Sequence, residues 1–163
     1  GCNMLIYLAG PLFNEAERAF NAQLTAKLEA RGFSVFLPQR DGLDFDKPQV
    51  QRMSDDERRE AIFALDRDKI LKADIFLFVL DGRVPDEGAC VELGIAYTRR
   101  YLAGGPKLLI GLKTDCRMFF PWAEINPLLS EALDSIVDKE DQLIEVLEGW
   151  RERPVVVNQR LNI

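Results

Sequence analysis

Histidine is absent from the 163 residues of this chain. It is the usual general base beside a serine or cysteine nucleophile and the commonest metal ligand, so its absence excludes Ser-His and Cys-His catalysis. Acid–base chemistry must therefore come from carboxylates, tyrosine, lysine or cysteine. The only cysteines are Cys2, Cys90 and Cys116, whose spacing fits neither a metal site nor a disulfide framework. We expect a reduced, cytoplasmic protein.

Long hydrophobic runs, a basic surface and phosphate-binding loops are missing as well. No apolar run approaches the roughly 18 residues of a membrane span. The net charge of −6 argues against a nucleic-acid polymer as partner, because binding its phosphates needs a basic surface. Neither GxGxxG nor GxxxxGK(S/T) occurs, which disfavours dinucleotide cofactors and ATP-type chemistry.

Apolar segments with strand character alternate with amphipathic segments of helical period. The expected strands are residues 4–9, 33–37, 75–80, 107–112 and 135–137. The expected helices are residues 14–30, 54–72, 86–100 and 139–151, with a short one within 121–133. These repeated strand–helix units predict a single α/β domain, in which a doubly wound, five-stranded parallel sheet is covered by helices on both faces in three layers.

Three segments fall outside this alternation. Residues 39–53 are polar, contain Gly42 and Pro48, and exceed the usual length of a connection, so we interpret them as a lid or binding loop. Residues 1–3 precede Met4, and we interpret them as an expression remnant and not a signal peptide. Residues 152–163 are expected to form a C-terminal tail, either an edge strand or an arm.

Ligands of doubly wound sheets bind outside the carboxyl ends of the strands. Four segments of this chain are expected to meet at that edge: residues 9–13, 38–53, 81–88 and the loop after Leu112. The residues that carry chemistry should therefore lie in these segments or in the helix turns that follow them.

The segment PDEGACVELGIAY, residues 85–97, places Glu92 among small and apolar residues of an expected helix. The residues expected to share its inner face are Val91, Ile95 and Gly88. A surface carboxylate is the alternative interpretation. Gly88 and Gly94 favour a buried role, because a glycine costs an exposed helix about 1 kcal/mol relative to alanine and makes sense where a ligand or backbone approaches closely.

Two further acids can join Glu92. Asp86 lies just before the helix, where it either caps the first turn or points into the same crevice. Paired carboxylates in a partly dry pocket suit glycosyl chemistry. Asp66 lies near the apolar side of the preceding helix, and its alternative is a helix ion pair with Arg59 or Lys69.

The first expected strand runs into IYLAGPLF, residues 6–13. Tyr7 is in the simplest interpretation a core aromatic whose hydroxyl needs a partner. Gly10 and Pro11 predict a turn with space for a ligand above it.

Together these segments resemble the nucleoside 2-deoxyribosyltransferase family. The resemblance rests on IYLAGPLF, on ALDRDKILKADIFLFVLDG (64–82), on PDEGACVELGIAY and on INPLL (125–129), which occur in this order within residues 4–130. Its most specific element is the pattern D-x-G-x-x-x-E-L-G at 86–94. The resemblance implies a flavodoxin-like fold and a cofactor-free exchange of bases on 2′-deoxynucleosides, with free nucleobases as the second substrate.

The resemblance also implies roles for individual residues. Glu92 would attack C1′ and form a deoxyribosyl–enzyme ester, Tyr7 would hydrogen-bond this carboxylate, and Asp66 would exchange a proton with the base. Asp86 and Asn126 would hold the 5′-hydroxyl, with Asn126 supplied by a neighbouring subunit of a homo-oligomer. The residues expected to contact the substrate are Asp86, Asn126, Gly10, Phe13 and Gly88. Candidates for base contacts in the long loop are Gln39, Arg40 and Asp41.

Three alternatives remain open. A nucleoside-5′-monophosphate N-glycosidase of the same superfamily would bind a phosphate, which a carboxylate at Asp86 repels. A nucleoside hydrolase would use water in place of the acceptor base. A non-catalytic receiver or nucleotide-sensing module would want acids at the end of the first strand, where this chain has Ala9, Gly10 and Pro11.

Overall fold

The computed structural model describes residues 3–44, 46–81, 84–104, 107–114 and 125–154. Its sheet consists of β1 (Leu5–Ala9), β2 (Ser34–Phe36), β3 (Ile75–Leu80), β4 (Leu108–Lys113) and β5 (Ser135–Val137). The five strands are parallel and follow the order β2-β1-β3-β4-β5. This is the flavodoxin-like order of a doubly wound sheet, and it confirms the predicted fold class.

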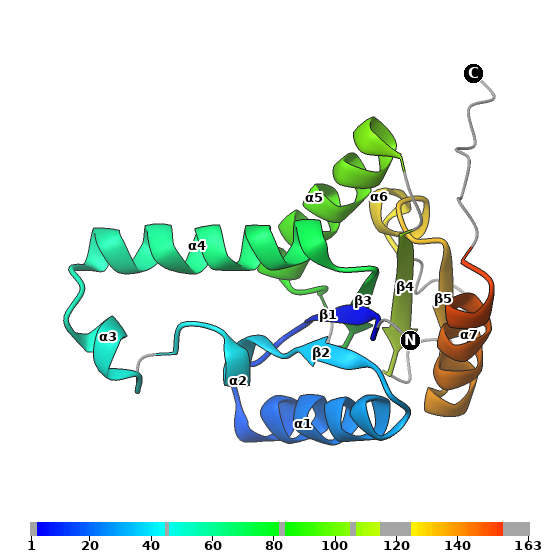
Figure 1. The fold of residues 1–163 in the computed structure, drawn as a ribbon, viewed down its shortest axis with the longest axis horizontal. Helices are drawn as coiled ribbons and strands as arrows, with labels where there is room; N and C mark the ends of the chain where they lie inside the picture. Colours follow the sequence, from blue (N-terminus) through cyan, green and yellow to red (C-terminus); the bar gives the residue numbers. More distant parts are fainter. Residues whose placement is uncertain (1–2, 45, 82–83, 105–106, 115–124, 155–163) are drawn as a thin grey trace.

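Helices cover both faces of the sheet (Figure 1). The long helices are α1 (Glu15–Ala30), α4 (Asp55–Lys72), α5 (Glu87–Ala103) and α7 (Glu140–Glu152). The short ones are α2 (Pro38–Asp41), α3 (Pro48–Gln51) and α6 (Pro127–Ser130). α1 and α7 pack on one face, and α4 and α5 pack on the other. None of the helices in the described ranges is long and apolar enough to cross a membrane.

Alternate residues of the strands point into two separate hydrophobic cores, one on each face of the sheet, because side chains of a strand alternate between the two faces. Ile6 and Leu8 of β1 pack in the core under α1 and α7, which contribute Leu24 and Leu147. Their neighbour Tyr7 faces the core under α4 and α5.

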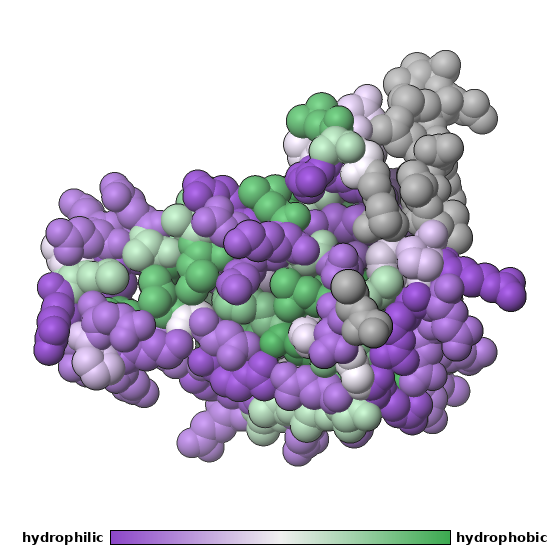
Figure 2. All heavy atoms as spheres, in the orientation of Figure 1, coloured by the Kyte–Doolittle hydropathy of each residue, from purple (hydrophilic) through white to green (hydrophobic). Residues whose placement is uncertain are grey.

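Hydrophobic residues also gather on the surface between α4 and α2, with hydrophilic residues around them (Figure 2).

The prediction that residues 39–53 form a loop is wrong in part, because this connection contains α2 and α3. Pro38 and Pro48 each occupy the first turn of a short helix. A proline is tolerated there because its missing N–H has no partner in the helix. The capping box of α4 is present: Ser54 accepts from the Glu57 N–H, and the Glu57 side chain accepts from the Ser54 N–H.

The helices that carry the candidate acids are anchored at the opposite edge of the sheet. Lys107 is buried, and its Nζ donates to the Ile70 carbonyl of α4 at 2.6 Å. Arg100 of α5 pairs with Asp134 at 2.6 Å and also donates to the Lys107 carbonyl at 3.1 Å. Burial, together with the neighbouring Arg99, lowers the pKa of Lys107 to about 8. The carboxyl-terminal ends of α4 and α5 are thus held to β4.

Gly10, directly after β1, is in close contact with β3. A Cβ at Gly10 would lie 2.9 Å from Val79 Cβ and 3.4 Å from the Val79 carbonyl oxygen. Such a distance is not tolerated without a backbone shift. Gly149 of α7 is the opposite case, because a Cβ there would have no described atom within 4 Å.

We expect opposite effects of alanine at these two glycines. Gly10→Ala should lower the free energy of unfolding by about 1–3 kcal/mol through overpacking. Gly149→Ala should raise it by up to about 1 kcal/mol, because alanine has the higher helix propensity. Urea denaturation of both variants measures the difference. Equal stability of the two variants would contradict the close contact at Gly10.

Candidate active site

The carboxyl ends of β1, β3 and β4 open onto a cavity of about 760 Å³. Pro11 and Phe13 line it from the loop after β1, Asp81 and Asp86 from the connection after β3, and Thr114 from the end of β4. Three of the four segments expected at this edge therefore meet there. The fourth, residues 38–53, contributes none of the described lining residues.

Tyr7, Asp66 and Glu92 lie close together, although they come from β1, α4 and α5, and none of them is among the described residues that line this cavity. Each of the two carboxylates raises the pKa of Tyr7, and Asp66 also raises the pKa of Glu92, so their charges are close. The Tyr7 side chain is fully buried. Its ring stacks between those of Phe36 and Phe76, with centroids 5.4 and 5.8 Å away. This stacking fixes the ring, whose hydroxyl is close enough to Glu92 to lower the pKa of that carboxyl.

Of the residues expected on the inner face of α5, Ile95 packs against the core, whereas Val91 and Gly88 do not. Val91 is 59% exposed, and Gly88 is exposed too, whereas Ala89, Leu93 and Ala96 are the buried residues of this helix. Glu92 precedes Leu93 and lies at the border of the buried stripe, half-buried. Its carboxyl group therefore points to the cluster and not to bulk water, and the surface alternative is wrong.

The cluster favours protonated acids. Burial raises the pKa of Glu92 to about 8, and the neighbouring Asp66 and Asp86 raise it as well, whereas the Tyr7 hydroxyl lowers it as a donor. Burial raises the pKa of Asp66 to about 6. Burial, Glu92 and Asp66 in turn raise the pKa of Tyr7. At pH 7 the Glu92 carboxyl is therefore largely protonated and Tyr7 is neutral.

Tyr7 and Glu92 also keep hydrogen-bonding capacity for a ligand. By strict distance and angle, neither the Tyr7 hydroxyl nor the buried Glu92 Oε2 has a hydrogen-bond partner among the described residues. The hydroxyl is nevertheless close enough to act on the pKa of Glu92. Buried polar atoms without partners are costly, and they are found at sites that bind a ligand.

Asp86 caps α5, which was one of its two predicted roles, and it also lines the cavity. Its Oδ2 accepts the Ala89 N–H at 2.8 Å. Gly88 leaves room for this carboxylate, since a Cβ there would lie 3.3 Å from Asp86 Oδ2. Gly88 thus acts on the position of Asp86. Phe13 lines the cavity from the loop after β1, whereas Gly10 is not among the described lining residues and packs on Val79.

The alternative ion pair of Asp66 is wrong within the described part of the chain. Arg59 pairs with Asp56, and the Lys69 ammonium lies 5.7 Å above the centre of the Phe36 ring. The Asp66 carboxyl is consequently left to the cluster with Tyr7 and Glu92.

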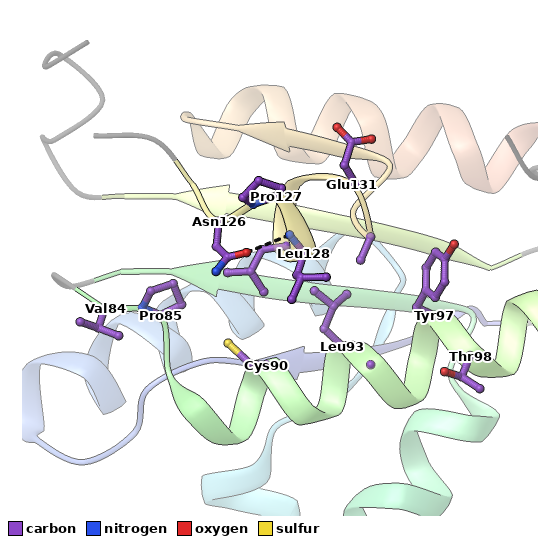
Figure 3. A pocket seen from close by; sticks show the side chains of 13 residues that line it. Val84, Pro85, Cys90, Leu93, Tyr97, Thr98, Asn126, Pro127, Leu128 and Glu131 are labelled. Carbon is purple, nitrogen blue, oxygen red and sulfur yellow. Dashed lines mark hydrogen bonds between the residues drawn. The ribbon is translucent and has the colours of Figure 1, made fainter. Parts of the chain in front are cut away.

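Asn126 lines a second cavity, of about 780 Å³, between α5 and α6 (Figure 3). Asn126 is exposed, and its Oδ1 accepts the Leu128 N–H at 2.9 Å as the cap of α6. Cys90, Leu93 and Tyr97 line the same cavity from α5. Glu92 is not among the described residues that line this cavity.

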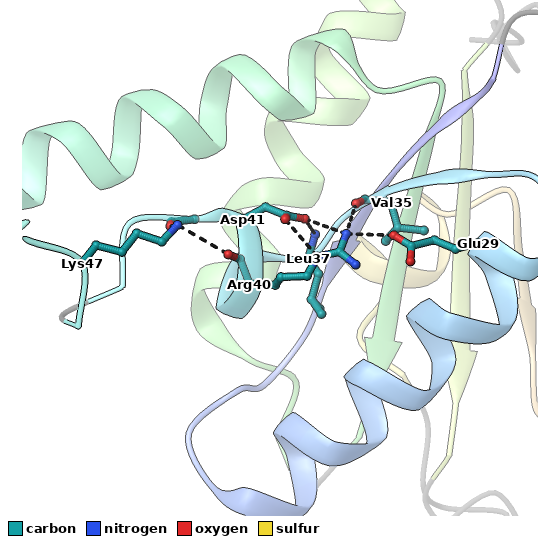
Figure 4. A network of polar contacts seen from close by, with 7 residues as sticks. Glu29, Val35, Leu37, Arg40, Asp41 and Lys47 are labelled. Atoms are coloured by element: carbon teal, nitrogen blue, oxygen red, sulfur yellow. Dashed lines mark hydrogen bonds and ion pairs between the residues drawn. The ribbon is translucent and has the colours of Figure 1, made fainter. Parts of the chain in front are cut away.

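The candidates for base contacts on α2 are occupied by contacts within the chain. Arg40 donates to Glu29 at 2.8 Å and to the Val35 carbonyl at 2.9 Å, and it pairs with Asp41 (Figure 4). Gln39 bonds to residues of α1. These side chains fasten α2 to α1 and β2.

Sequence reasoning missed the buried Asn21 of α1, which is 2% exposed. Its position gave a usable signal, because Asn21 precedes the buried Leu24 by three residues and thus falls on the apolar stripe of the helix.

In the described ranges, no group of three or more cysteine, aspartate and glutamate residues is arranged to hold a metal ion. Cys2 and Cys116, and the predicted tail beyond residue 154, lie outside the described residues.

Comparison with known proteins gives a family and two related folds. The model of the nucleoside 2-deoxyribosyltransferase family matches residues 6–146. A conserved protein from Enterococcus faecalis V583 has a similar structure, with a TM-score of 0.71, 23% identity and coverage of 91% of this chain and 99% of that one. A 2-deoxyribosyltransferase from Bacillus psychrosaccharolyticus superimposes with a TM-score of 0.68, 25% identity and coverage of 85% and 89%. No curated protein matched significantly in sequence.

Substitutions around Glu92 should move its pKa in opposite directions. Tyr7→Phe removes a donor to the carboxylate and should raise the pKa above about 8, whereas Asp66→Asn removes a nearby negative charge and should lower it. Carbon-13 NMR of glutamate-labelled protein measures this titration, and the resonance lost in Glu92→Gln assigns it. Asp68→Asn is the control, because Asp68 is exposed and pairs with Arg67. Shifts of the same sign in both variants would contradict the cluster.

Proposed function

This chain belongs to the nucleoside 2-deoxyribosyltransferase family, and we propose that it transfers the 2-deoxyribosyl group of 2′-deoxynucleosides between nucleobases. The observation that carries the proposal is the buried Glu92 carboxyl beside Tyr7 and Asp66. A carboxylate nucleophile with a second acid nearby is what a retaining displacement at a sugar carbon needs.

In the first half-reaction, Glu92 attacks C1′ as the carboxylate and the bond between C1′ and the base nitrogen breaks. A proton passes from the Asp66 carboxyl to the leaving base, so neutral base and a deoxyribosyl–Glu92 ester result. In the second half-reaction, a new base attacks C1′ from the side that the first base left, gives its proton to Asp66 and frees Glu92. Two inversions retain the β configuration.

Glu92 and Asp66 hold the proton that moves in the two half-reactions. With the pKa of Glu92 near 8 and that of Asp66 near 6, a proton rests mainly on Glu92 at pH 7. In the protonation state that reacts, this proton is on Asp66 and Glu92 is a carboxylate. Positive charge that develops on the sugar in the transition state favours the Glu92 carboxylate, and the Tyr7 hydroxyl can donate to the same group.

Asp86 supports a nucleoside over a nucleotide. Its carboxylate lines the cavity at the carboxyl edge of the sheet, where a 5′-hydroxyl can donate to it. A 5′-phosphate would meet like charge from Asp86 and from Asp81 and Glu17 of the same lining.

A second copy of the chain would complete the site with Asn126. Asn126 lines a cavity to which Glu92 does not contribute, and the neighbouring Leu128 is 82% exposed. Val91 and Leu102 of α5 are 59% and 76% exposed, which leaves hydrophobic surface for association. Gly94 between them has open space above it.

Base exchange tests the proposed function directly. Incubation with a deoxynucleoside and a second free base, followed by chromatography, should yield the new deoxynucleoside, and Glu92→Gln should lower the rate about 1000-fold or more. Glu87→Gln is the matched control, because Glu87 is an exposed acid of the same helix. Release of free base without a new deoxynucleoside would indicate a hydrolase, and full activity of Glu92→Gln would overturn the nucleophile.

Mixing two inactive variants tests the partner's Asn126. Chains with Glu92→Gln and chains with Asn126→Ala, co-expressed, should regain up to about a quarter of wild-type activity, because mixed dimers then hold one site with both native groups. Sedimentation of the mixture checks that mixed oligomers form. If mixing gives only the sum of the separate activities, Asn126 does not act across subunits.

A further inference from the structure

The loop after β1 is held to α1 by a buried amide. Asn21 is 2% exposed, and its Nδ2 donates to the Pro11 carbonyl at 3.0 Å. Pro11 and Phe13 line the cavity at the carboxyl edge of the sheet. On its other side, this loop rests on β3 through the close contact of Gly10 with Val79. The loop is therefore fixed from two sides.

The same amide reaches the connection after β2. Asn21 Nδ2 lies 3.4 Å from Gln39 Oε1, and Gln39 Nε2 donates to the Arg18 carbonyl at 2.8 Å. Gln39 belongs to α2, whose neighbouring Arg40 binds Glu29 of α1 (Figure 4). The loop after β1 and the helix after β2 consequently share one anchor on α1.

Arg18, one turn before Asn21, repeats this bridging at the surface. Its Nη1 approaches the Leu12 carbonyl at 3.4 Å, and its Nη2 pairs with Asp44 at 3.0 Å. The pair is partly exposed, so its contribution is small. Asn21 is buried, where an amide without partners would cost about 1–3 kcal/mol, so its two contacts decide the geometry.

We propose that Asn21 is a positioning residue for the substrate cavity: its amide sets the Gly10–Phe13 loop and couples it to α2, so that both move as one unit. The kinetic part of this proposal rests on the proposed transferase function. Asn21 does not touch the reacting atoms and acts through Pro11. Displacing a substrate-contacting loop by about 1 Å can cost up to about 100-fold in catalytic efficiency.

Asn21→Leu is the test, because leucine keeps the shape of the side chain and removes both donors. The KM for the deoxynucleoside should rise about tenfold or more, while kcat changes less than about threefold, since Glu92 and Asp66 stay in place. Gln23→Leu is the matched control on the exposed side of α1. A purely structural role would instead reduce the active fraction and kcat with KM unchanged, and that result would overturn the proposal.

Hydrogen exchange tests the coupling without any turnover. The N–H groups of Arg40, Asp41 and Gly42 bond to the carbonyls of Leu37 and Pro38. Their exchange should accelerate about tenfold in Asn21→Leu and not in Gln23→Leu. Unchanged exchange in α2 would overturn the coupling, whatever the kinetics show.

Gln39→Met covers the case in which Asn21→Leu does not fold, because it breaks the same link from the α2 side. It should raise KM in the same direction and accelerate exchange in α2. If the wild-type protein exchanges no bases, the proposed function fails, and the hydrogen-exchange comparison still decides whether Asn21 joins the two segments.

Discussion

One buried carboxyl group is the constraint on which the rest of this structure depends. Glu92 reaches from α5 to Tyr7 and Asp66, where burial favours the protonated acid. A charge in such surroundings is costly unless a neighbour compensates it. In the proposed transfer reaction, the sugar carbon that becomes positive during bond cleavage would be such a neighbour, and it exists only while the bond breaks. The site is thus poor at holding an anion at rest and suited to a transient cation.

The cluster depends on contacts far from it. Tyr7, Asp66 and Glu92 come from elements that are distant in the chain, so their spacing is only as fixed as the packing of α4 and α5 on the sheet. Lys107 and the pair of Arg100 with Asp134 hold these helices at the opposite edge. The acids are therefore placed by a rigid scaffold, whereas the cavity at the carboxyl edge is lined largely by loops and the start of α1.

The centre of the sheet was predictable from the sequence because β1 and β3 are continuous apolar runs, as is typical of buried parallel strands. The connection after β2 was not, because Pro38 and Pro48 begin helices, and a proline marks a turn just as well. On α5, Val91 was misjudged, because a shift of one residue, or about 100° of helix, turns it outward. The position of Asn126 in the cavity between α5 and α6 depends on how α6 packs, which no local pattern encodes.

The aromatic stack around Tyr7 has a consequence for the cost of reaction. Its ring lies nearly parallel to Phe76 and close to parallel to Phe36. The neighbouring rings hold the Tyr7 phenol in one orientation. Its hydroxyl therefore does not have to turn toward Glu92 when that carboxyl group becomes charged. The orientation is acquired once, when the core folds, so folding supplies the preorganisation that water would otherwise have to provide by rearranging at every turnover.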